Sequence, residues 1–183
     1  NPDGGTAGDY SFRLLDLADQ PLLEFDTIQE GTLEPRETDL FRFEGRAGQQ
    51  LFLQSYAVQG SWSLYGPSNQ QLGGGGLQSG GDILLPGDGN YLLRLKSDSL
   101  SPISYEYQLI TPEMQITSLT LGATVVSSLS QPGERDVFTF SGHIGQRVYL
   151  DRTDSPYTIN YLPIEMISPS GSSVLYSNYG ADD

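Results

Sequence analysis

A stretch of nineteen residues occurs twice in this chain, and the two copies lie 97 positions apart. Residues 35–53 match residues 132–150 at nine of these nineteen positions without a gap. The shared residues include two phenylalanines, two glycines, a leucine and an aspartate, so the repeat keeps its apolar spacing and its turns. A repeat of this length predicts a tandem array of one folding unit, and such arrays usually display, space or bind.

Two weaker matches extend the repeat beyond this stretch. Residues 10–15 resemble residues 105–110 at an offset of 95. Residues 63–68 resemble residues 165–170 at an offset of 102, because the second copy has a longer loop before this segment. No segment of the second copy matches residues 83–95, so the last part of the repeat has no second counterpart in the sequence.

These matches predict three parts of the chain. Residues 1–19 are expected to hold the last strand of a preceding module and a linker, and residues 20–111 one complete module. Residues 112–183 are expected to form a second module, truncated at its C-terminus. A truncated sandwich exposes strand edges, so we expect either further residues or another chain to complete it. The strand at Tyr10–Leu15 is a candidate for completing a neighbouring copy by strand addition.

Apolar residues alternate with polar residues along several short segments, and no segment has a helical period. Residues 91–95 and 105–109 show this alternation, which is typical of strands that bury one face. Glycine-rich segments, including residues 73–76 and 80–81, separate the apolar runs and are predicted to be turns. The pattern predicts an all-β protein made of tandem antiparallel β-sandwich modules of the jelly-roll type, the second one incomplete.

The composition excludes several classes of protein. The chain has 23 acidic and 9 basic residues, a net charge of −14, which disfavours nucleic acid and anionic membranes as partners. It has no cysteine, so it forms neither disulfides nor thiolate metal sites. No apolar run is long enough to span a bilayer as a helix, so no direct membrane insertion is expected.

Several motifs occur in a fixed order along the first module. They are Asp-Leu-Phe-Arg-Phe at residues 39–43, Ala-Gly-Gln at 47–49, Leu-Tyr-Gly-Pro at 64–67, Gly-Asp-Gly-Asn-Tyr at 87–91 and Tyr-Glu-Tyr-Gln-Leu at 105–109. In this order the motifs resemble those of bacterial pre-peptidase C-terminal domains. The resemblance covers nearly all of the first module and the first two-thirds of the pattern in the second.

The resemblance implies a non-catalytic, secreted β-sandwich of the jelly-roll type. Such domains are attached to exported proteases or strung together in large surface proteins, and some relatives bind collagen, polysaccharide or calcium. The chain departs from the family at residues 66–69, where Gly-Pro-Ser-Asn stands in place of the usual Asp-Pro-x-Gly. At the position of the family's aspartate this chain has Gly66.

Four aspartates are candidate calcium ligands, because carboxylates near glycine-rich loops supply the hard oxygen atoms that Ca²⁺ prefers. They are Asp39 and its counterpart Asp136, at equivalent strand starts, and Asp82 and Asp88, in loops. Their spacing matches neither an EF-hand nor a calcium-binding nonapeptide repeat. The alternative is structural, since aspartate at a strand entrance commonly accepts hydrogen bonds from turn N–H groups. No cofactor other than calcium is expected.

Aromatic side chains offer a second kind of candidate site. Trp62 and Tyr65 would bind sugar rings if they were exposed, whereas buried rings would simply fill the sandwich. The single histidine, His143, corresponds to Arg46 in the first copy, which is typical of a solvated turn residue. No nucleophile and base are paired in the sequence, so no enzymatic activity is predicted.

The sequence therefore predicts an extracellular or cell-surface protein whose repeated modules serve as spacer, structural element or adhesive surface. A carbohydrate-binding or calcium-stabilised accessory module of a secreted hydrolase is the alternative. The expected partners are neighbouring modules or copies of the chain itself, with extracellular polysaccharide or matrix as further candidates.

Overall fold

The computed structural model describes residues 12–57, 59–151 and 163–177 of the chain. By its internal contacts the chain divides into two compact units, Asn1–Phe140 and Ser141–Asp183. This division lies later in the sequence than the module boundary expected between residues 111 and 112.

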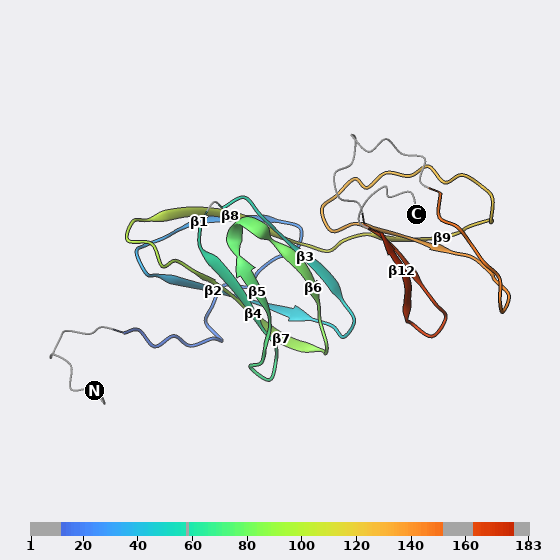
Figure 1. The fold of residues 1–183 in the computed structure, drawn as a ribbon. Coiled ribbons are helices and arrows are strands. Elements are labelled where there is room, and N and C mark those ends of the chain that lie inside the picture. Colours follow the sequence, from blue (N-terminus) through green and yellow to red (C-terminus); the bar gives the residue numbers. More distant parts are fainter. Residues whose placement is uncertain (1–11, 58, 152–162, 178–183) are drawn as a thin grey trace, which may run out of the picture. The chain divides into compact units, whose positions relative to one another are not determined.

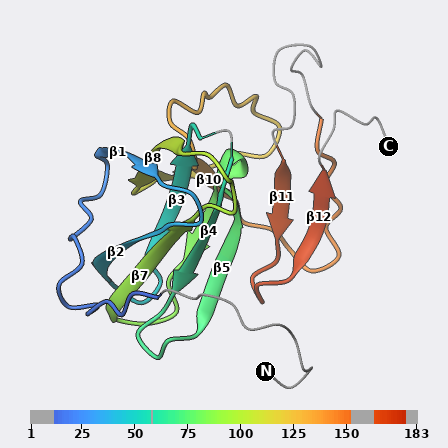
Figure 2. The ribbon, with the colours of Figure 1, turned by 90° about the vertical axis from the view of Figure 1, so that its left-hand side faces the viewer.

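Most of the first unit is a sandwich of two four-stranded antiparallel sheets, which form separate layers in Figures 1 and 2. One sheet has the order β1-β8-β3-β6, formed by Ile28–Leu33, Ile103–Ile110, Gln50–Ser55 and Gly81–Leu84. The other has the order β2-β7-β4-β5, formed by Thr38–Gly45, Gly89–Lys96, Ser61–Tyr65 and Gln71–Gly76. A short 3₁₀ helix, η1 (Leu77–Ser79), joins β5 to β6. The predicted all-β sandwich is confirmed.

The core lies between the two layers and is filled by alternate residues of their strands. Strand β7 buries Tyr91, Leu93 and Leu95, as the alternation of its sequence predicts. Aromatic rings join the layers: the ring centroids of Phe41 on β2 and Tyr107 on β8 lie 5.5 Å apart, edge to face. The apolar face of each sheet is therefore buried against the other sheet.

The glycine-rich segment at residues 73–76 is not the turn that the sequence predicts, but part of edge strand β5. Trp62, on the neighbouring strand β4, packs its indole ring over these glycines. A Cβ atom at Gly73 would lie 3.4 Å from the ring, and one at Gly75 would lie 3.5 Å from its Nε1 atom. The strand therefore presents bare backbone to the ring, which is 5% exposed.

Both copies of the repeat contain a parallel contact that the expected antiparallel pattern does not include. In the first copy the backbone N–H of Leu23 donates to the carbonyl oxygen of Arg42 at 2.8 Å. In the second copy β9 (Met114–Ser118) pairs in parallel with β10 (Arg135–Thr139). The N–H of Leu119 there donates to the carbonyl oxygen of Thr139 at 2.7 Å, so the same contact recurs 96 to 97 positions later.

The turns of the two copies also correspond residue by residue. Three positions with positive φ in the first copy recur with positive φ in the second, namely Arg36 and Gly133, Gly48 and Gly145, and Asn69 and Gly171. The carboxylate of Glu37 accepts a hydrogen bond from the backbone N–H of Glu34, and Glu134 accepts the equivalent bond from Gln131. Backbone and hydroxyl hydrogen bonds from Ser130 lower the pKa of the exposed Glu134 carboxyl.

The second unit contains an antiparallel hairpin, β11 (Ile164–Ile167) and β12 (Ser173–Ser177), seen in Figure 2. Its pairing register shifts between Met166 and Ile167. The register of β4 and β5 shifts at the equivalent place, between Leu64 and Tyr65, at an offset of 102. The two hairpins therefore share the same irregularity.

The expected strand at Tyr10–Leu15 lies partly outside the described residues. From Phe12 to Leu15 the chain forms no strand, and the side chain of Leu14 is 92% exposed.

Substitution of Gly80 tests how tightly the two layers are joined at η1. Gly80 has φ 57° and ψ −153°, a conformation that only glycine adopts readily, and a Cβ there would meet the carbonyl oxygen of Leu53. We expect Gly80→Ala to lower the free energy of unfolding by about 3 kcal/mol, measured by urea denaturation.

The matched control is Gly87→Ala, because a Cβ at Gly87 meets nothing within 4 Å and its φ is not positive. This variant is expected to unfold like the parent protein. Equal stability of the two variants would contradict the described packing of Gly80 against β3.

Candidate interaction sites

Asp39 is held by a hydrogen bond that crosses the sandwich. Strand β2 carries Asp39 and strand β8, in the other sheet, carries Tyr105, whose hydroxyl donates to Asp39 Oδ2 at 2.8 Å. Gly31 on β1 makes room for the tyrosine, because a Cβ at Gly31 would meet its hydroxyl group. Burial, together with this bond to the carboxylate, raises the pKa of Tyr105, so its hydroxyl stays protonated.

Asp136, the counterpart of Asp39, accepts a hydrogen bond from the hydroxyl of Ser127. The two aspartates therefore have the same role as acceptors but different donors. Both side chains bind within their own copy of the repeat, and the donors are hydroxyl groups rather than the turn N–H groups that the structural interpretation expected.

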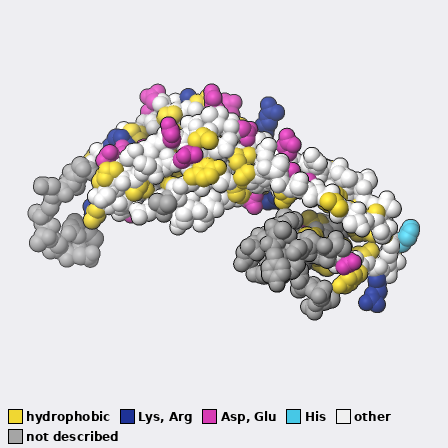
Figure 3. All heavy atoms as spheres, turned by 90° about the horizontal axis from the view of Figure 1, so that it is seen from above, with side chains coloured by type: hydrophobic (Ala, Val, Ile, Leu, Met, Phe, Trp, Pro, Cys, Tyr) yellow, Lys and Arg dark blue, Asp and Glu magenta, His cyan; other side chains and the backbone are white. Residues whose placement is uncertain are grey.

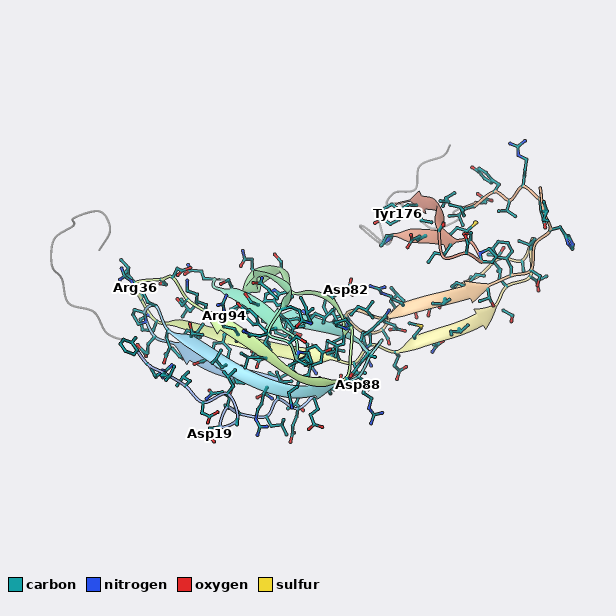
Figure 4. All side chains as sticks on the ribbon, turned by 90° about the horizontal axis from the view of Figure 1, so that it is seen from below. Asp19, Arg36, Asp82, Asp88, Arg94 and Tyr176 are labelled. Atoms are coloured by element: carbon teal, nitrogen blue, oxygen red, sulfur yellow. The ribbon has the colours of Figure 1, made fainter. Side chains whose placement is uncertain are left out.

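The remaining carboxylate candidates point to different partners. Asp88 Oδ1 accepts the backbone N–H of Ala47 at 2.8 Å, and Asp82 Oδ2 lies 3.1 Å from Arg135 Nη2. Figure 4 shows Asp82 and Asp88 apart from each other, and Figure 3 shows acidic side chains spread over one face of the first unit. Within residues 12–57, 59–151 and 163–177, no three acidic or histidine side chains come together as a metal site.

The two aromatic candidates occupy different environments. Trp62 faces the core, so its ring offers no surface for a sugar. It is a core residue and not the ligand-binding residue that was considered from the sequence. The burial follows from its position opposite Leu95 on β7 and beneath the glycines of β5. Tyr65 is half-buried on the opposite, outer face of the same sheet.

Tyr65 belongs to a small cationic and aromatic group that sequence reasoning missed. Arg94 on β7 places its guanidinium carbon 5.3 Å from the centroid of the Tyr65 ring, and its Nη2 donates to Ser63 Oγ at 3.0 Å. Its Nε atom is buried and has no hydrogen-bond partner among the described residues. The group presents one positive charge, that of Arg94 (labelled in Figure 4), on the outer face of sheet β2-β7-β4-β5.

Only the pairing of the strands reveals this group. Arg94 stands opposite Ser63 in the register of β4 and β7, although 31 positions separate them in the sequence. The alternation of the sequence predicts the polar positions of each strand, but it does not predict that β4 and β7 are neighbours.

In the second unit, two apolar side chains of the segment that corresponds to β3 are exposed. Leu51 of β3 is 1% exposed, whereas its counterpart Val148 is 41% exposed. Tyr149 is 69% exposed. His143 lies in the turn that precedes this segment, and its backbone N–H donates to Gln146 Oε1 at 2.9 Å. The Arg46 N–H makes the same bond to Gln49 at 3.0 Å, as expected for a turn residue.

No protein-family model matches the chain, and no curated protein matches it. Solved structures with a similar fold include the pre-peptidase C-terminal domain of collagenase from Bacillus anthracis. It is 17% identical, covers 50% of this chain and 94% of its own, and has a TM-score of 0.41. Among the described residues, no helix is long and apolar enough to cross a membrane.

PliG of Aeromonas hydrophila, a periplasmic lysozyme inhibitor of g-type lysozyme, is also similar in fold. It is 15% identical, covers 49% of this chain and 95% of its own, and has a TM-score of 0.41. PliG of Salmonella Typhimurium is 18% identical, covers 49% and 97% of the two chains, and has a TM-score of 0.37.

The two neighbouring tyrosines of β8 allow a matched test of the bond that crosses the sandwich. Tyr105→Phe removes the donor to Asp39 and is expected to lower the free energy of unfolding by about 2 kcal/mol, because a buried hydrogen bond to a charged group is lost.

Tyr107→Phe is the control, because the Tyr107 hydroxyl is buried without a hydrogen-bond partner among the described residues. It is expected to leave stability unchanged or to raise it slightly. Urea denaturation measures the free energy of unfolding of both variants. A larger decrease for Tyr107→Phe than for Tyr105→Phe would refute the assigned roles.

Proposed function

We propose that this chain is a non-catalytic repeat module that acts as spacer, structural element or adhesive surface in an extracellular or cell-surface assembly. The observation that carries the proposal is that Asp39 and Asp88 form hydrogen bonds within the sandwich. The bond from Tyr105 to Asp39 holds one sheet to the other, and Asp88 holds a turn together. These carboxylates stabilise the sandwich and are already paired.

The arrangement of reactive side chains favours the same conclusion. Nucleophilic catalysis requires a nucleophile and a base within hydrogen-bonding distance. The single histidine lies in an exposed turn, and the sequence has no cysteine. A binding or structural role suits this chain better than a catalytic one.

The module boundaries are part of the proposal. We place a complete module at residues 20–111 and a second module from residue 112, with residues 1–19 belonging to a preceding module and its linker. The recurring turns, the recurring parallel contact and the shared register shift of the two hairpins support this assignment. Modules that bury their own apolar faces join readily in series.

A second candidate function is ligand binding by the outer face that carries Arg94 and Tyr65. A guanidinium over an aromatic ring, with a hydroxyl beside it, suits carboxylate and hydroxyl groups such as those of an acidic polysaccharide. Calcium stabilisation, the other alternative, has no cluster of carboxylates in its favour within the described part of the chain.

Immunogold electron microscopy of cells that make this protein tests the main proposal. Gold particles are expected on the outer surface or on extracellular material of intact cells. Antibody absorbed with the purified chain serves as the control. Labelling confined to the cytoplasm of sectioned cells would show the proposed function to be wrong.

A polysaccharide co-sedimentation assay tests the second candidate. If the outer face binds an acidic polysaccharide, Arg94→Ala is expected to weaken binding about tenfold, because a charge-assisted hydrogen bond is lost. Arg36→Ala, which removes an exposed arginine from the turn before β2, should bind as the parent does. Equal binding by both variants would exclude Arg94 from the site.

A further inference from the structure

Strand β3 of the first unit is an inner strand with a partner on each edge. Strand β6 pairs with one edge of β3, and strand β8 with the other. In the register with β8, Leu53 stands opposite Leu109 and Gln54 stands opposite Gln108. The two leucines are fully buried, and the two glutamines face outward.

The counterpart of β3 in the second unit is the segment 147–151. The same turn leads into both, since Gly145 and Gln146 repeat the geometry of Gly48 and Gln49. Yet segment 147–151 pairs with no strand among the residues that the structure describes. Two of its apolar side chains, Val148 and Tyr149, are exposed and Leu150 is half-buried, whereas the counterpart of Leu150 in β3, Leu53, is fully buried.

Residues 12–15 carry the pattern of the strand that pairs with β3. Phe-Arg-Leu-Leu at residues 12–15 corresponds to Tyr-Gln-Leu-Ile at residues 107–110, with apolar and polar positions in the same order. In this chain residues 12–15 form no strand. Arg13 makes two exposed contacts, a hydrogen bond from Nη2 to the carbonyl oxygen of Thr38 at 3.3 Å and an ion pair of 3.7 Å with Glu37. Exposed pairs of this kind contribute little to stability.

If residues 12–15 and segment 147–151 adopt the register of β8 and β3, an apolar residue stands opposite an apolar residue and a basic residue opposite an acidic one. Leu14 then stands opposite Leu150, as Leu109 does opposite Leu53. Arg13 stands opposite Asp151, where the first unit has two neutral glutamines. Oppositely charged residues directly across two strands attract, so this register is favoured over a slip by one residue.

A strand of this kind closes the module that precedes it. In the first unit β8 is the last strand of the sandwich, and only residues 111–113 separate it from β9, where the next copy of the repeat begins. Residues 12–15 likewise precede the parallel contact at Leu22, which begins the first copy. By the same order residues 12–15 lie outside the module at residues 20–111, and segment 147–151 of another copy offers a strand position of the kind that β8 fills beside β3.

We propose that residues 12–15 of a second copy of this chain add as an antiparallel strand to segment 147–151, with Arg13 opposite Asp151 and Leu14 opposite Leu150. The proposal rests on the modular function proposed above and names the partner, which is the chain itself. The contact joins residues 12–15 of one copy to segment 147–151 of another, so the two copies contribute different surfaces and the contact is heterologous.

The absence of native cysteine makes disulfide trapping a direct test. Two single-cysteine variants, Arg13→Cys and Asp151→Cys, are mixed under mild oxidation and run on a non-reducing gel. Residues paired across two strands lie within disulfide range, so the mixed dimer is expected to form at least about tenfold faster than in the control mixtures. The controls are Arg13→Cys with His143→Cys, and Arg36→Cys with Asp151→Cys.

Thermal melting of each variant, all of them at exposed positions, verifies that the folds are intact. Equal rates in the test and control mixtures would overturn the proposed pairing. A double variant with both cysteines that closes on itself at high dilution would also overturn it, because the strand would then come from the same copy. The modular function would survive either result, since the cellular location of the protein decides that question separately.

Discussion

One inner strand of each sheet comes from the end of the module, and the rest of the sandwich depends on these two strands. Strand β7 lies between β2 and β4, and strand β8 lies between β1 and β3. Until these two strands are in place, β2 and β4 have no common neighbour, and neither have β1 and β3. The module therefore closes through contacts between distant parts of the sequence, which makes folding slow and leaves apolar edges exposed in any incomplete copy.

This constraint explains the difference between the two copies of the repeat. Features that need only local residues recur in the second copy: the turns with positive φ, the capping glutamate and the hairpin with its shifted register. Features that need the late strands do not recur among the described residues. Segment 147–151 is not paired, and β10 pairs with β9 alone.

The sequence predicted much of the fold, because alternation along β7 and β8 reports which side chains are buried. It did not predict that residues 73–76 form a strand, since glycine ordinarily signals a turn and the indole ring of Trp62 accounts for Gly73 and Gly75 only through the fold. The burial of Trp62 and the pairing of Arg94 with Tyr65 were also hidden, because both depend on which strands are neighbours. The partner of Asp39 lies 66 positions away, beyond the reach of any local pattern.

We propose that segment 147–151 of the second unit pairs with a strand from another copy. Hydrogen exchange at increasing protein concentration measures this pairing directly. Backbone amides of residues 103–110 should be protected at every concentration, because β8 is paired within the first unit. Amides of residues 147–151 should exchange rapidly in dilute solution and become protected as the concentration rises. Protection of residues 147–151 that does not change with concentration, or its absence at all concentrations, would contradict the account.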